Sequence, residues 1–353
     1  MNFKNQRERR ERFAKRFQHF ATVISFLVLA LLFVSCWLVG QGTSRTNNQP
    51  KAANIRPAPI VSTPAPPSDW LAPQARSAQH TPQLPMHWSE TLVTTGITHL
   101  AATPYLQNMD VLRALPATLA PEQFELLRDL LALPSDPNGS MELLEFNGVK
   151  NVAADFLLRQ TDFPADLAFD FCAMFADEVY DVVWRDYCLQ MAVGCGLALS
   201  QRGHDDQTAE ALGIILHTLR AATGMTDHSW PGTALFGLNT LHRSGYDAVS
   251  AAEVETLALS MALNEKASEA ARISALRVCG EHKLAACATV ARSLAQNGAT
   301  ESLRGAAIAT LGDLALTEDI ALLERLSHTH DPFLAKVAQN ARTRIAATEE
   351  WTP

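Results

Sequence analysis

The sequence predicts an all-α protein that is anchored to a membrane by one helix near its amino end. Three observations support this fold class. Residues 20–40 form an apolar run without a charged side chain. Residues 41–90 contain nine of the chain's 18 prolines. Beyond them, apolar residues recur at intervals of three and four, which is the period of an α-helix.

The apolar run, FATVISFLVLALLFVSCWLVG, is 21 residues long. At about 1.5 Å per residue it matches the hydrocarbon core of a bilayer, so we expect residues 20–40 to form a transmembrane helix. Residues 1–19 carry seven basic and two acidic side chains, a net charge of +5, and since the whole chain carries −8, residues 41–353 carry −13. Basic flanks stay in the cytoplasm. We therefore expect a cytoplasmic tail at 1–19, a single pass through the inner (plasma) membrane, and a periplasmic domain in a Gram-negative-type envelope.

Two alternatives keep this topology but change the anchor. A cleaved signal peptide has an apolar region of about 7–15 residues, and the run here is longer. In the second alternative, Val34-Ser35-Cys36 resembles the end of a lipoprotein signal, in which Cys36 would carry the lipid. An acyl chain would be redundant beside a full span, so an uncleaved signal anchor is the simpler interpretation.

Residues 41–90 are predicted to be a Pro-rich disordered linker. Proline fixes φ and has no backbone N–H, so this segment builds neither a helix nor a strand ladder. A semi-extended chain of this length could hold a domain on the order of 100 Å from the membrane. Proline-rich segments also dock in aromatic grooves, but outside the cytoplasm a spacer is the simpler interpretation.

From residue 91 onward the helical period dominates. Residues 122–133 follow Pro121 and end before Pro134, and proline at these places marks the two ends of a helix. We expect further helices at 151–159, 167–175, 182–199, 208–220, 233–241 and 254–263. Residues 91–265 are thus predicted to be an α-helical domain, and the sequence leaves open whether it contains degenerate repeats.

Residues 266–350 contain an internal repeat. The segment ARISALRVCGE, from residue 271, aligns with LRGAAIATLGD, from residue 303, at a spacing of 32. The matched pairs at this spacing are Arg272 and Arg304, Ala275 and Ala307, Gly280 and Gly312, and Arg304 and Lys336. Second helices are expected at 284–294 and 319–326. Each unit would then be helix, turn, helix, which is typical of a stacked α-solenoid.

This region resembles HEAT-type repeats, with Asp331-Pro332 at the place of the family's Asp-Pro turn. The resemblance covers about 80 residues. It implies an α-solenoid of HEAT-like helix pairs, and such arrays usually present a surface to another macromolecule. An irregular helical bundle with a chance duplication is the alternative.

Five cysteines lie in the part that we expect to be exported, where an oxidising compartment favours disulfides. Cys279 and Cys287 flank a short turn, so we predict a disulfide between them. Cys188 and Cys195 stand seven residues apart on one predicted helix, about 10.5 Å, which is too far for a disulfide. Either of them could meet Cys172. Burial of reduced cysteine as a small apolar residue is equally common.

His328, His330 and Asp331 form a cluster of metal-ligand residue types. A three-ligand site needs partners that the sequence does not supply, so we assign no catalytic, cofactor-binding or metal-binding residue and no cofactor. Residues 227–231 (DHSWP) read as a loop, and its residue types are those of a catalytic triad, but contiguous residues rarely reach that geometry. A metal-dependent hydrolase that uses the first cluster, or His228, remains an alternative function.

Tyr180, Trp184 and Tyr187 lie among acidic residues near a predicted helix start, as in a partner-binding surface. Their i, i+4, i+7 spacing favours the buried face of a helix over an interface. The negative charge of the exported part argues against a nucleic-acid partner, and no small-molecule substrate is indicated. The sequence therefore predicts a non-enzymatic, membrane-anchored, extracytoplasmic scaffold or adaptor that binds another envelope protein. A passive structural spacer is the further alternative.

Overall fold

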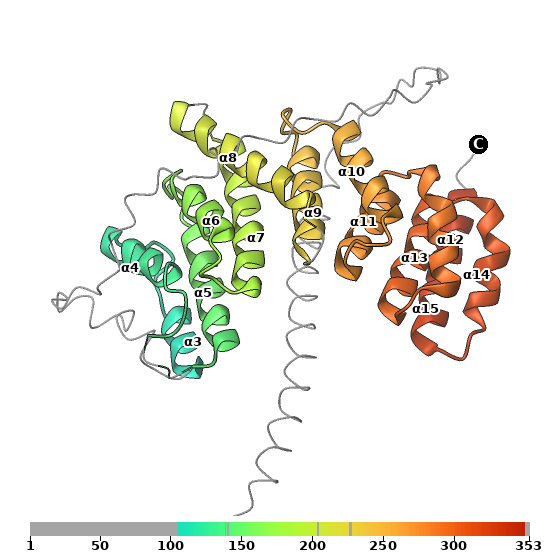
Figure 1. Cartoon of the computed structure of the whole chain (residues 1–353), viewed down its shortest axis with the longest axis horizontal. Coiled ribbons are helices and arrows are strands. Elements are labelled where there is room, and N and C mark those ends of the chain that lie inside the picture. Colours follow the sequence, from blue (N-terminus) through green and yellow to red (C-terminus); the bar gives the residue numbers. More distant parts are fainter. Residues whose placement is uncertain (1–104, 138, 140, 203–204, 226–227, 350–353) are drawn as a thin grey trace, which may run out of the picture. The chain divides into compact units, whose positions relative to one another are not determined.

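The computed structural model describes residues 105–349, except residues 138, 140, 203–204 and 226–227 (Figure 1). The chain divides into two units, Met1–Ala65 and Pro66–Pro353, and all of the described residues belong to the second. The predicted tail at 1–19, the span at 20–40 and the linker at 41–90 lie outside the described residues. No helix within the described ranges combines the length and the hydropathy that a membrane crossing requires.

Every regular element of the described residues is a helix, and they contain no strand, so the all-α prediction is confirmed. Two short 3-10 helices, η3 (Ala285–Cys287) and η4 (Thr317–Asp319), join α-helices near the carboxyl end. The α-helices are α3 (Tyr105–Arg113), α4 (Pro121–Leu131), α5 (Leu143–Leu158), α6 (Leu167–Ala176), α7 (Val182–Ser200), α8 (Asp206–Thr223), α9 (Trp230–Arg243), α10 (Ala251–Leu263), α11 (Glu269–Glu281), α12 (Ala288–Asn297), α13 (Glu301–Leu314), α14 (Ile320–Ser327) and α15 (Pro332–Glu349).

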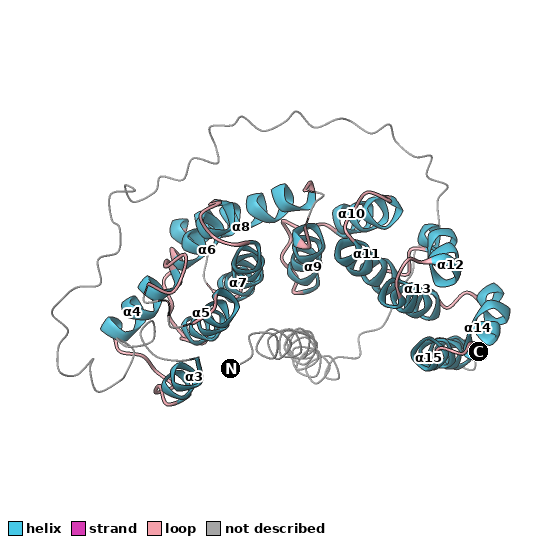
Figure 2. Cartoon of the chain, turned by 60° about the horizontal axis from the view of Figure 1, so that its bottom comes forward, coloured by secondary structure: helices cyan, strands magenta, loops and turns pink. Residues whose placement is uncertain are grey.

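The helices pack in two rows, which Figure 2 shows nearly end-on. In the first, the stacked row, each helix packs against the next one of the row; its members are α5, α7, α9, α11, α13 and α15. In the second, the covering row, each helix packs against the stacked-row helix that follows it in sequence; its members are α4, α6, α8, α10, α12 and α14. The stacked row is thereby buried between its own neighbours and the covering row.

The helix pairs are offset by one helix from the units that the repeat predicts. We expected the helix at 271–281 to pair with the following helix at 284–294. In the structure α12 packs mainly against α13, and α11 packs against α10. The cause is η3, which lies against α10 and leads the chain away from α11 before α12 begins. The packed pairs are therefore α10–α11, α12–α13 and α14–α15.

Side-chain caps recur with the period of the repeat. Ser268, Thr300 and Asp331 accept hydrogen bonds from backbone amides in the first turns of α11, α13 and α15, at 3.2, 3.2 and 3.1 Å. Each bond satisfies an amide that has no partner inside its helix. The repeat thus marks where each of these helices begins.

The repeated arginines bind the ends of the preceding helices. Arg272 donates to the Ala262 carbonyl in α10 at 3.5 Å, and Arg304 donates to the Ala295 carbonyl in α12 at 3.4 Å. A guanidinium at a helix C-terminus pairs with carbonyls that lack an intrahelical partner and with the negative end of the helix dipole. The spacing of 32 residues therefore records one contact that is made twice.

The repeated glycines allow the stacked helices to approach closely. A Cβ atom on Gly312 of α13 would lie 2.7 Å from the Cα atom of Ala341 in α15. A Cβ atom on Gly280 of α11 would lie 3.0 Å from the Cβ atom of Asp313 in α13. Since larger residues would push the helices apart, these positions keep the stacked row tight.

The helices of the stacked row run parallel, because four bonds join the start of one to the start of the next. These bonds are Asn147 Nδ2 to Asp181 Oδ2 (2.9 Å), Trp230 Nε1 to the Val182 carbonyl (3.3 Å), Ser268 Oγ to the His228 carbonyl (2.7 Å) and Thr300 Oγ1 to Glu269 Oε1 (2.6 Å). The first turns of α5, α7, α9, α11 and α13 therefore lie along one edge of the row, which we call the N-terminal edge.

Candidate interaction surface

The segment between α6 and α7 is held in place from several sides. Asp181 caps α7 by accepting from the amides of Val183 and Trp184, at 2.9 and 3.2 Å, and it also accepts both bonds that Asn147 Nδ2 donates from α5. Tyr180 donates its hydroxyl to the Ala132 carbonyl at the end of α4, at 2.9 Å. Residues 177–183 are therefore positioned by α4, α5 and α7 together.

A buried lysine supports this segment from below. Lys150 is fully buried, and its ammonium donates to the Leu133 carbonyl at 3.0 Å. Its Nζ lies 4.0 Å from the centroid of the Trp184 ring, with the rings of Phe146 and Tyr180 at 5.3 and 5.5 Å. Loss of hydration lowers the pKa of Lys150 from its ordinary value of 10.5 to about 7. Lys150 and Tyr180 thus satisfy the carbonyls that follow α4.

Exposed apolar side chains gather where α5 and α7 begin. We call them the apolar patch; they are Leu143, Leu144, Val179, Val182 and Val183, with exposed fractions between 36% and 59%. The two halves of the patch adjoin, because Asn147, one turn after Leu143, bonds Asp181, the residue before Val182. Exposed apolar clusters on a soluble domain mark sites of interaction.

Acidic side chains surround the apolar patch. We call them the acidic rim; they are Glu142, Glu145, Asp177, Glu178 and Asp181. The segments 142–147 and 177–183 contain no lysine or arginine. Among the residues that the structure describes, no lysine or arginine forms an ion pair with a rim carboxylate. The rim therefore presents its negative charge to the solvent.

A polar cluster ties the start of α9 to α7 beside the patch. Asp186 of α7 accepts hydrogen bonds from Thr233 Oγ1 at 2.8 Å and from Ser229 Oγ at 3.3 Å. The guanidinium of Arg185 lies over the Trp230 ring, 4.4 Å from its centroid. Burial raises the pKa of Asp186 above its ordinary value. These contacts hold the first turn of α9 against α7.

The triad-like residue types around His228 do not assemble a triad. The His228 ring packs on the Trp230 ring, with 4.2 Å between centroids. Within the described part of the chain, no hydrogen bond joins this ring to Ser229 or Asp186. The loop expected at 227–231 is also shorter than predicted, because Trp230 and Pro231 open α9. Proline fits the first turn of a helix, where no partner for its missing N–H is needed.

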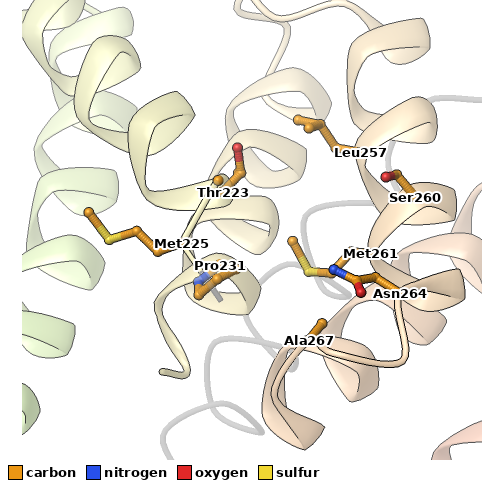
Figure 3. A pocket seen from close by; sticks show the side chains of 9 residues that line it. Thr223, Met225, Pro231, Leu257, Ser260, Met261, Asn264 and Ala267 are labelled. Carbon is orange, nitrogen blue, oxygen red and sulfur yellow. The ribbon is translucent and has the colours of Figure 1, made fainter. Parts of the chain in front are cut away.

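A cavity of about 210 Å³ opens on the other side of α9, between α8, α9 and α10 (Figure 3). Its wall includes the apolar side chains of Met225, Pro231, Leu257 and Met261. Sites for small molecules usually measure about 300–1,000 Å³, so this cavity is small for a cofactor. Methionine adapts to varied apolar shapes, and the cavity suits a single side chain of a partner.

The residues predicted to bind a partner divide between core and surface. Trp184 is fully buried under the segment 177–183, so its ring belongs to the core. Tyr180 and Tyr187 are half-buried, and for them partner binding stays a prediction. The sequence reasoning missed the neighbouring valines. Val182 and Val183 follow the cap Asp181 at the start of α7, a place where exposed residues are common, and that signal could have found them.

The histidine cluster shows no metal geometry. Asp331 caps α15 through the amides of Phe333 and Leu334, at 2.9 and 3.1 Å. The ring of His328 contacts Glu324 Oε1 at 3.0 Å. Across the described residues, no three side chains of histidine, cysteine, aspartate or glutamate come together as metal ligands do. A metal-dependent hydrolase therefore gains no support from the geometry of His328, His330 and Asp331.

All five described cysteines are buried free thiols. Cys279 and Cys287 share a hydrogen bond across the turn after α11, which raises the pKa of the Cys279 thiol and lowers that of Cys287. Burial raises the pKa of Cys172 to about 12 and that of Cys188 and Cys195 well above the ordinary value. The predicted proximity of Cys279 and Cys287 is present, and their disulfide stays a prediction.

The sequence matches no known protein family and no curated protein. One similar solved structure is that of human deoxyhypusine hydroxylase in complex with glycerol, at 14% sequence identity over 73% of this chain and 98% of the other, with a TM-score of 0.29. A likeness at this identity and TM-score assigns no activity to the chain.

Proposed function

We propose that this chain is a membrane-anchored, extracytoplasmic helical-repeat scaffold or adaptor that binds another protein of the envelope. The observation that carries the proposal is the apolar patch on the N-terminal edge. Five apolar side chains are exposed on a segment that Asn147, Tyr180 and Trp230 hold in place. A surface fixed before binding loses little conformational entropy when a partner docks.

Two further features support this function. The chain stacks its helices in pairs, and stacked pairs offer an extended surface rather than an enclosed chamber. The apolar run at 20–40, with its basic flank, would anchor this surface to the membrane with the described domain outside the cytoplasm.

Site-specific photo-crosslinking tests the proposal in native membranes. A photoreactive phenylalanine replaces Val179, which is 59% exposed in the patch, in the full-length chain. The matched control carries it at Leu263, which is 54% exposed at the end of α10, away from the patch. We expect Val179 to give one discrete protein adduct and Leu263 to give none.

The alternative of a passive spacer makes the opposite prediction. If neither position gives an adduct, or if both give the same set of proteins, the patch binds no specific partner and the proposed function is wrong. Sequencing the crosslinked peptide identifies the partner and the partner segment that lies on the patch.

A further inference from the structure

We infer that the partner binds the apolar patch with a basic amphipathic segment, whose apolar side chains cover the patch while its lysines and arginines face the acidic rim. This inference rests on the proposed function and goes beyond it, because it states the chemistry of the partner. The patch alone would accept any apolar surface. The acidic rim restricts the choice.

The charge around the patch has one sign. Glu142 and Glu145 flank the leucines on α5, and Asp177, Glu178 and Asp181 flank the valines before α7. The two nearest cations are withdrawn from the surface. Lys150 is fully buried on the Leu133 carbonyl, and Arg185 is taken up by the Phe175 carbonyl, at 2.7 Å, and by the Trp230 ring. A basic partner would therefore meet no repulsion at the rim.

Other occupants fit this surface less well. Nucleic acid and anionic lipid head groups carry the same sign of charge as the acidic rim and would be repelled. An acidic or uncharged apolar segment would leave the rim carboxylates partly desolvated without a countercharge, which costs binding energy. A second copy of this chain could reach the patch only with a basic surface of its own.

The roles of patch and rim can be separated by experiment. Apolar contact at the centre of an interface supplies most of the affinity, while exposed charges at its rim mainly raise the association rate and make it depend on salt. Changing the rim should therefore alter the preference between basic and acidic ligands. Changing the patch should weaken both.

The test uses the full-length chain in nanodiscs of phosphatidylcholine, with empty nanodiscs as the blank. Three labelled helical peptides of roughly 16 residues, about four turns, serve as probes and are followed by fluorescence anisotropy. The basic probe has leucines on one face and lysines on the other. The acidic probe carries glutamate in place of each lysine, and the polar probe carries serine in place of each leucine.

We expect the basic probe to bind at least about tenfold more tightly than the acidic probe, which is about 1.4 kcal/mol, and the polar probe not to bind. Adding salt should narrow this difference. Glu142→Lys with Glu178→Lys should abolish the preference, and the exposed pair Asp206→Lys with Glu210→Lys on α8 should preserve it as the matched control. Val179→Ser with Val183→Ser should weaken both apolar probes, and Leu263→Ser should not.

Three results would overturn the inference. In the first, the acidic probe binds as tightly as the basic probe. In the second, the preference survives Glu142→Lys with Glu178→Lys, which places the basic site elsewhere. In the third, the peptide crosslinked from Val179 in native membranes is acidic, uncharged or part of a second copy of this chain. The third result leaves the proposed function in place when the adduct is another protein, whereas a missing adduct contradicts the proposed function itself.

Discussion

At the scale of single residues, Lys150 is a cation that the fold places in an apolar environment. Its ammonium has one oxygen partner, the Leu133 carbonyl, and three aromatic rings around it. Aromatic faces and the C-terminal end of α4 stabilise the charged form in part. Desolvation is larger and lowers the pKa to about 7. Near neutral pH this residue is therefore close to half protonated.

This shift predicts how stability depends on pH. Between about pH 7 and the ordinary Lys value of 10.5, the unfolded chain binds a proton that the folded chain has released, so the free energy of unfolding rises with pH. We expect a rise of about 2 kcal/mol from pH 7 to about pH 9 that is absent in Lys150→Met. Urea unfolding followed by circular dichroism measures it.

Lys336→Met is the control for this experiment, because Lys336 is exposed on α15. It should keep the pH profile of the parent protein. A parent profile that is flat in this range would show that Lys150 keeps its ordinary pKa.

Two glycines on different helices offer a second prediction at this scale. Gly312→Ala would place a Cβ atom 2.7 Å from Ala341 and force α13 and α15 apart, so it should lower the free energy of unfolding by about 2 kcal/mol. Gly213→Ala on α8 meets nothing within 4 Å and should raise it by about 0.5 kcal/mol, because alanine favours the helix. Denaturant unfolding of both variants decides. Equal shifts in one direction would contradict the close packing of the stacked row.

At the scale of elements, the start of α5 shows how a distant contact overrides a local pattern. We expected a helix at 151–159, because Asn147 and Gly148 read as a break, but α5 begins at Leu143. Asn147 is buried and bonds Asp181, 34 residues away. Gly148 leaves room for the Tyr105 ring, which would lie 3.4 Å from a Cβ atom there. Both residues serve tertiary contacts and do not end the helix.

The turn between α11 and η3 carries the prediction for the cysteine pair. The backbone turns back at Lys283, with φ at 53°, and the Leu284 amide donates to the Cys279 carbonyl at 2.9 Å. This geometry brings Cys279 and Cys287 into contact. In an oxidising compartment we expect them to form a disulfide. Alkylation and mass spectrometry without reduction, on protein taken from its native membrane, should find both thiols blocked and should find them free after reduction.

At the scale of the whole molecule, membrane attachment is the prediction that decides where the binding surface acts. Residues 20–40 should hold the chain in the membrane fraction against carbonate and high salt, because transferring this apolar length to water is unfavourable. A chain lacking residues 1–40 should be released. Protease added to intact spheroplasts should remove the described domain and leave the amino-terminal tail.

The same experiment separates the alternatives for the anchor. A cleaved signal peptide would give a mature chain that starts after the apolar run and is not retained. Lipidation at Cys36 would give a mature chain that begins at that residue and is retained by its acyl groups. The mass of the amino-terminal peptide distinguishes the two from an intact signal anchor.

The sequence by itself determined the features that depend on neighbours along the chain. Helical periodicity identified the all-α class, and the spacing of 32 residues located Arg272, Arg304, Gly280 and Gly312. These residues recur because each repeat makes the same short-range contacts, so a local pattern records them. The stacked pairs follow from the same periodicity, although their partners shifted by one helix.

Only the tertiary structure decided which side chains are covered. Lys150, alone on the apolar face of α5, lies in the core, whereas Val182 and Val183 remain exposed. Burial depends on contacts such as Trp230 to the Val182 carbonyl, 48 residues apart in sequence. A periodic pattern indicates that a face is apolar, but the neighbouring helix determines whether water is excluded from it. The apolar patch and its acidic rim therefore emerged with the packing of the helices.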